Sequence, residues 1–186
     1  MVDLLAGNSY FIEHRGGSGL LRPIIDFKDG KGNLLMSASV PMLYTNPVLI
    51  KGSDDKLIGK VKQKISIPIS WELYEADGDK PIATAKCGIM SNLVSDAVQV
   101  YDTNGKLISA AKGITLMDLD IVSASGKKIA KLSSPEAKKS KLLNMLGGIP
   151  AAKSYNLSIL SKNAIPKLIL MELVICVMMF PNKKQG

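Results

Sequence analysis

The sequence predicts a mainly β fold, a sandwich or closed barrel of repeated hairpins that encloses a hydrophobic C-terminal helix. Three observations support this prediction: a turn motif that recurs along the chain, apolar residues that alternate with polar ones between the turns, and an apolar segment at residues 164–180. The chain has 186 residues, of which 46% are hydrophobic and 22% charged. That composition is typical of one globular domain with a sizeable core.

In the recurring motif, a turn is followed by a lysine or asparagine and then by two apolar residues. Its five copies lie at residues 29–35, 54–58, 77–82, 103–108 and 124–129. Counted between Asn33, Lys56, Lys80, Lys106 and Lys127, the spacings are 23, 24, 26 and 21 residues. Asn-Gly and Asp-Gly are strong hairpin signals, and we expect type I′ turns with positive φ at both central residues. Each repeat is therefore predicted to be one hairpin.

The segments between the turns are predicted to be strands, because apolar and polar residues alternate along them. They lie at residues 65–74, 82–87, 97–101, 119–122 and 155–160. Short strands separated by regular turns indicate an all-β sandwich or a barrel.

The apolar segment at residues 164–180 is predicted to be a helix, either a membrane span or the centre of a protein core. It has 17 residues, whereas a span needs about 20. Lys167 and Glu172 interrupt it, and charges are costly at bilayer depth. Pro166 lies near its start, where a helix tolerates proline. The sequence therefore favours a helix inside the core.

A second helix is predicted between Ser134 and Gly148. Ser134 and Pro135 are suited to its cap and first position, and the glycines at 147 and 148 to its end. Residues 1–25 and 181–186 are predicted to be a peripheral N-terminal segment and a tail, which leaves residues 26–180 as the domain.

The charge is unevenly distributed along the chain. The formal net charge is +8 and the pI about 9.4; residues 121–186 hold 11 lysines and 2 acids, or +9, which leaves 13 − 14 = −1 for residues 1–120. A basic region suits an anionic partner such as a membrane surface, a phosphorylated lipid headgroup or nucleic acid. The alternative is that the lysines only keep the protein soluble.

Three phrases carry a resemblance to a known family: residues 54–65, residues 100–108 and the terminal helix from Pro166 to Phe180. Tandem hairpins followed by a strongly hydrophobic C-terminal helix resemble the tubby C-terminal-like superfamily, which includes the LURP-one-related proteins and the phospholipid scramblases. The resemblance covers roughly residues 30–180. It implies a closed barrel of about twelve antiparallel strands with the C-terminal helix through its centre. In that superfamily, tubby domains bind phosphoinositides and scramblases are linked to calcium-dependent lipid movement.

The residues offer little for catalysis, and an enzyme is not expected. His14 is the only histidine, and it lies beside a glycine-rich stretch outside the predicted barrel. A structural zinc site needs four Cys or His ligands, and the chain has three in all. The acids at residues 75–79, and Asp118 with Asp120, are predicted to be solvated rather than to bind calcium. No cofactor or metal is expected.

The two cysteines, Cys87 and Cys176, lie among apolar neighbours and are predicted to be buried free thiols. Free thiols fit a reducing compartment. Because the N-terminus also shows no secretory signal, the sequence predicts a cytoplasmic protein, with the inner membrane surface as a peripheral location.

The best candidate site is a lysine stripe. Lys60, Lys62 and Lys64 recur at period two, so on a strand they point the same way. Three like charges in a row repel unless an anion or nearby acids offset them. A headgroup phosphate is the expected anion, with Lys51 or Lys86 joining from neighbouring strands. The alternative is an ordinary outer barrel face.

The second candidate is a set of lysines on the predicted helix from Ser134, namely Lys138, Lys139 and Lys141. A basic amphipathic helix of this kind can lie on an anionic membrane, or it can plug one end of the barrel.

Together these features predict a non-enzymatic, membrane-peripheral module that binds anionic phospholipid headgroups. The alternative is an intracellular protein-interaction or structural barrel with no lipid role. Nucleic acid is disfavoured as a partner, because three phenylalanines and one tryptophan are few for base stacking.

Overall fold

The computed structural model describes residues 7–15, 23–41, 46–87, 95–115, 118–135, 154–161 and 163–179. These residues form twelve strands and one helix, α2 (Lys167–Met179). The strands are β1 (Ser9–Arg15), β2 (Ile24–Lys28), β3 (Leu34–Ser39), β4 (Val48–Gly52), β5 (Leu57–Lys64), β6 (Ser70–Glu75), β7 (Ala83–Cys87), β8 (Ser95–Asp102), β9 (Leu107–Thr115), β10 (Asp118–Ser123), β11 (Lys128–Ser133) and β12 (Ser154–Ile159).

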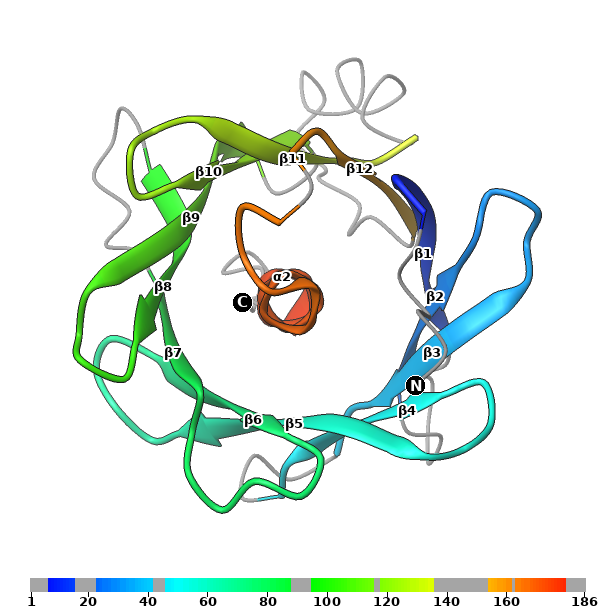
Figure 1. The fold of residues 1–186 in the computed structure, drawn as a ribbon, viewed down its shortest axis with the longest axis horizontal. Helices are drawn as coiled ribbons and strands as arrows, with labels where there is room; N and C mark the ends of the chain where they lie inside the picture. The colour runs from blue at the N-terminus through cyan, green and yellow to red at the C-terminus, as the bar shows by residue number, and fades with distance from the viewer. Residues whose placement is uncertain are drawn as a thin grey trace, which may run out of the picture.

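The twelve strands form a closed antiparallel barrel in which each strand pairs with its neighbours in sequence. Figure 1 looks down this barrel and shows α2 at its centre. A barrel of about eight strands is just filled by its own side chains, so twelve strands leave room for a helix. The structure thus confirms the predicted closed barrel and its enclosed C-terminal helix.

Strand β1 closes the barrel, which corrects the prediction that residues 1–25 are peripheral. It pairs with β12 from Ser9 to Glu13 and with β2 from Phe11 to Arg15. Tyr10 and Ile12 point into the core and are fully buried. His14, predicted to lie outside the barrel, is part of this strand, and burial lowers the pKa of its imidazole.

The repeated turns join successive strands of the barrel, and four of them share one geometry. In the turn from Asp102 to Lys106, the Gly105 amide donates to the Asp102 carbonyl at 3.0 Å and the Asp102 amide donates to the Lys106 carbonyl at 2.9 Å. The same bonds recur in the turns that contain Gly32, Asp55 and Gly126. Each turn has a single residue at positive φ, between 62° and 86°.

This pattern is a type I turn followed by one left-handed residue, so the expected type I′ geometry is wrong. A G1-type bulge follows each of these turns, and the strand registers shift there. Because strands run alternately up and down, all five repeated turns lie at one end of the barrel, which we call the hairpin end. We call the opposite end, where residues 65–69 connect β5 to β6, the loop end.

The central helix begins at Lys167, three residues after the predicted start, and the Leu170 amide donates to the Pro166 carbonyl at 3.1 Å. Residue 180, its predicted end, lies outside the described residues. Every residue from Ile169 to Val177 is buried, so the helix is covered on all faces by the barrel. In the part of the chain that the structure describes, no helix is long and apolar enough to cross a membrane.

The strand predicted at residues 65–74 begins only at Ser70. Residues 65–69 form a loop instead, and the side chains of Ile65 and Ile67 are fully exposed. Pro68 explains the difference, because proline cannot donate to a strand ladder and is excluded from the interior of a sheet.

The barrel interior is well filled among the described residues. Trp71, Phe27 and Met36 project from the strands into the core cluster that includes the helix residues, and they are at most 1% exposed. A cavity of about 10 Å³ lies beside Ile129, Asn163 and Leu170 at the hairpin end, and it holds no more than about one water molecule. Both cysteines are buried thiols that form no disulfide, as predicted.

Candidate headgroup-binding face

The lysine stripe lies on the outside of β5. Gly59 and Val61 point into the barrel and are buried, whereas Lys60, Lys62 and Lys64 alternate with them and face outward. The regular two-residue period of the strand therefore places the three ammonium groups on one face, over a length of roughly 13 Å.

One acid lies in the middle of this face. Glu72 on β6 stands opposite Lys62 in the strand register, and the Lys64 ammonium lies 2.5 Å from its Oε1. The Tyr74 hydroxyl donates to the other carboxylate oxygen of Glu72 at 2.8 Å. Lys60 lies over the Tyr74 ring, 6.0 Å from its centroid, and donates to the Gly78 carbonyl at 3.3 Å.

These contacts set the protonation of Glu72 and Tyr74. Burial acts to raise the pKa of Glu72, but hydrogen bonds from Lys64 and Tyr74 and the charges of Lys64 and Lys62 outweigh it and hold this pKa below its usual value. Burial, the hydrogen bond to Glu72 and the charge of Glu72 raise the pKa of Tyr74 to about 12. Glu72 is therefore an anion and Tyr74 a neutral donor at neutral pH.

Lys86 on β7 lies in one row with Lys64 of the stripe. Ser70 pairs with Lys64 on one side and with Lys86 on the other, so the two lysines share one row across β5, β6 and β7. The Lys86 ammonium lies 5.0 Å from the centroid of the Tyr101 ring, close enough for a cation–π contact that directs the side chain.

Lys51 points outward from β4 but toward the hairpin end, where it forms an ion pair with Asp55 at 3.0 Å. It is therefore separate from the row of Lys64 and Lys86. The second predicted set, Lys138, Lys139 and Lys141, lies outside the described residues.

The face made by Lys60, Lys62, Lys64 and Lys86 around Glu72, which we call the lysine face, carries 4 − 1 = +3. Lys62 is exposed and forms no ion pair within the described ranges. Clustered ammonium groups that a single carboxylate only partly offsets can bind phosphate oxygens as point charges.

Sequence reasoning missed Tyr74 and Tyr101, which orient two of the lysines, and it missed Glu72 as the offsetting acid. Tyr74 and Glu72 share the polar positions of an alternating strand. The alternation of this strand could have placed Tyr74 and Glu72 on its outer face. Only the strand register shows which lysines these two residues contact.

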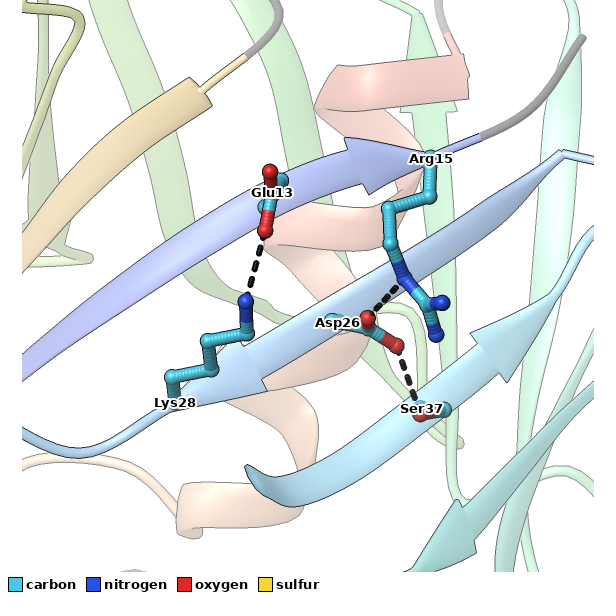
Figure 2. Close-up of polar contacts among 5 residues, drawn as sticks. All are labelled: Glu13, Arg15, Asp26, Lys28 and Ser37. Atoms are coloured by element: carbon cyan, nitrogen blue, oxygen red, sulfur yellow. Dashed lines mark hydrogen bonds and ion pairs between the residues drawn. The ribbon is translucent and has the colours of Figure 1, made fainter. Parts of the chain in front are cut away.

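Other charged groups on the barrel wall are paired in ways that indicate structural roles. Asp118 and Asp120 form ion pairs with Lys131 at 3.1 Å and Lys128 at 2.7 Å. Across β1, β2 and β3, Asp26 accepts hydrogen bonds from Arg15 and from the Ser37 hydroxyl, and Lys28 contacts Glu13 at 2.7 Å (Figure 2).

Comparison with known protein families finds no match, and no curated protein matches the sequence. Among solved structures, the fold is similar to the X-ray structure of a protein from Arabidopsis thaliana, AT5G01750, with a TM-score of 0.59 and 11% sequence identity. The similarity covers 91% of this chain and 89% of that chain. At this identity the comparison shows a shared fold.

Proposed function

We propose that the protein is a membrane-peripheral module of the cytoplasm that binds anionic phospholipid headgroups through its lysine face. The observation that carries the proposal is the grouping of Lys60, Lys62, Lys64 and Lys86 on adjacent strands around one acid. Such a face keeps a net positive charge that an anion can neutralise.

A ligand site on the outer surface is supported by the described barrel interior, which is occupied by α2 and by core side chains. Surface lysines attract anionic lipids by about 1 kcal/mol each, and salt screens the attraction. The proposed binding is therefore strongest at low ionic strength.

The resemblance to the tubby C-terminal-like superfamily supports the proposal. In that superfamily tubby domains recognise phosphoinositides, and the hairpin repeats and hydrophobic terminal helix of this chain follow the same plan. The fold alone does not assign a ligand, so the proposal depends on the lysine face.

The test is flotation of the full chain with two kinds of phosphatidylcholine vesicle. One contains about 30% phosphatidylserine, similar to a biological anionic content, and the other contains none. The variant K60Q/K62Q/K64Q removes three charges from the face. Its matched control, K127Q/K128Q/K131Q, removes three charges at β11 and the turn before it, on the opposite side of the barrel.

We expect binding to anionic vesicles at low salt, weakened roughly a hundredfold in the face variant and far less in the control. Equal losses in the two variants would assign the binding to overall charge and overturn the role of the face. If the chain does not float at low salt, the headgroup proposal is wrong, and recovery of one stoichiometric protein partner would support the interaction-domain alternative.

A further inference from the structure

The β5–β6 loop at the loop end exposes two large apolar side chains. Ile65 is 93% exposed and Ile67 is 103% exposed, whereas the next most exposed apolar side chain among the described residues, Leu160, is 59% exposed. Fully exposed neighbouring isoleucines are unfavourable in water, and apolar groups grouped in this way mark interaction sites.

Hydrogen bonds hold the loop in shape. The Ser66 hydroxyl donates to the Pro68 carbonyl at 2.8 Å, which leaves Ser66 Oγ to accept from the Ser70 hydroxyl, also at 2.8 Å. The Cys87 amide donates to the Ile69 carbonyl at 2.8 Å, and Ile69 packs against the core. The loop is therefore anchored on both sides of Ile67, and its two exposed isoleucines do not fold back onto the barrel.

The isoleucines directly continue the lysine face. Lys64 precedes Ile65 in the chain, Lys62 lies two residues earlier, and Lys86 shares the row of Lys64. An apolar tip with a rim of lysines matches the two layers of an anionic membrane, whose phosphates lie above its acyl chains. A protein partner would need an apolar pocket within an acidic rim. No described feature of this surface favours such a partner over a membrane.

We propose that the β5–β6 loop inserts Ile65 and Ile67 into the acyl boundary of an anionic membrane, while Lys62, Lys64 and Lys86 contact the headgroup phosphates. This inference rests on the proposed headgroup function and adds an orientation, with the loop end of the barrel toward the membrane. Insertion adds binding that salt does not screen, because burial of apolar surface is independent of charge.

A tryptophan in place of Ile67 reports insertion directly. The native Trp71 is only 1% exposed inside the barrel and gives a constant background. We expect the emission of I67W to shift to the blue on phosphatidylserine-containing vesicles and to be quenched by lipids brominated in the acyl chain. The matched control is L160W, which places tryptophan at an exposed apolar position at the hairpin end and should show neither change.

The variant I65S/I67S measures the contribution of insertion to binding. We expect about a hundredfold weaker binding, tenfold for each isoleucine, with most of the loss persisting at high salt. L160S is the control and should bind as the native chain does. The circular dichroism spectra should be unchanged, because these side chains lie outside the core.

The outcomes separate the two proposals. Flotation with an unshifted I67W spectrum would overturn insertion and leave headgroup binding intact. Equal shifts in I67W and L160W would also overturn it, because they indicate adsorption without orientation. A shift of I67W on neutral vesicles that K60Q/K62Q/K64Q leaves unchanged would uphold insertion and overturn the headgroup role. If the chain floats with none of the vesicles, both the headgroup proposal and the insertion proposal are wrong.

Discussion

The Glu172 carboxyl group lies against the backbone of Gly59 in the middle of the barrel. A Cβ atom at residue 59 would lie 3.0 Å from Glu172 Oε1, so glycine provides the space that this side chain occupies. Glu172 is fully buried, and neither carboxylate oxygen has a hydrogen-bond partner of good geometry among the described residues. Burial raises the pKa of Glu172 to about 9. The Tyr74 backbone opposes this rise, and the charge of Glu75 adds to it. The helix therefore carries a neutral acid through an apolar core at neutral pH.

Replacement of Glu172 by glutamine should change how stability depends on pH. The unfolded chain releases this proton near the ordinary pKa of 4.5, whereas the folded protein keeps it until about pH 9. Between these values the folded state binds the extra proton, so stability falls as pH rises, by about 1.4 kcal/mol per pH unit. The contribution is fully present below pH 4.5, and its loss is complete above about pH 9.

Urea unfolding of the native chain and E172Q at several pH values measures this dependence. The other titratable groups act equally in both proteins, so the difference isolates Glu172. We expect similar stability near pH 5 and a growing advantage for E172Q toward pH 8. A constant difference over that range would show that Glu172 ionises within the folded barrel and contradict its raised pKa.

Alanine at position 59 should destabilise the barrel. Its Cβ would meet Glu172 Oε1 and the Tyr74 carbonyl at 3.0 Å and the side chain of Leu168 at 3.1 Å. A backbone carbonyl in a sheet cannot move away easily, so we expect a loss of about 1–3 kcal/mol in the free energy of unfolding. Gly30→Ala is the control, because its Cβ would meet nothing within 4 Å. Equal stability of the two variants would show that both the helix and the β6 backbone can shift to make room.

The barrel could be predicted because its signals are local and repeated. Turn residues fix the hairpins, and the mostly apolar 17-residue segment at 164–180 needs a protein interior large enough to hold a helix. Sequence reasoning failed where distant contacts decide. Strand β1 pairs with β12 and β2. Its short, irregular pattern of apolar residues does not indicate either pairing.

The lysine face was only half predictable. Period-two spacing places Lys60, Lys62 and Lys64 on one side of a strand, but register decides that Glu72 lies between them and that Lys51 does not join. The alternation at residues 65–74 also misled, since Ile65 and Ile67 fit a strand pattern that Pro68 interrupts.

The two thiols should be nearly unreactive in the folded protein. Cys176 is 0% exposed and Cys87 is 9% exposed. Burial raises the pKa of Cys176, and the neighbouring Glu172 and Cys87 raise it further, whereas thiol reagents attack the thiolate. We expect an aromatic disulfide reagent to titrate no thiol of C87S before unfolding and one thiol in denaturant. Rapid reaction of native C87S would mean that the central helix leaves the barrel readily.

Two ion pairs on the same pair of strands should differ in their contribution to stability. Asp26 is 2% exposed and accepts hydrogen bonds from Arg15 and Ser37, whereas the Glu13 side chain, which contacts Lys28, is 38% exposed (Figure 2). Removal of the Asp26 carboxylate deletes a buried acceptor of two hydrogen bonds, one of them from a charged guanidinium, so D26A should lose about 1–3 kcal/mol. E13A breaks a solvated pair and should lose under about 1 kcal/mol.

Urea unfolding of both variants at low and high salt distinguishes the cases: the E13A loss should shrink with salt and the D26A loss should persist. Similar, salt-sensitive losses would show that Asp26 acts only as a surface charge.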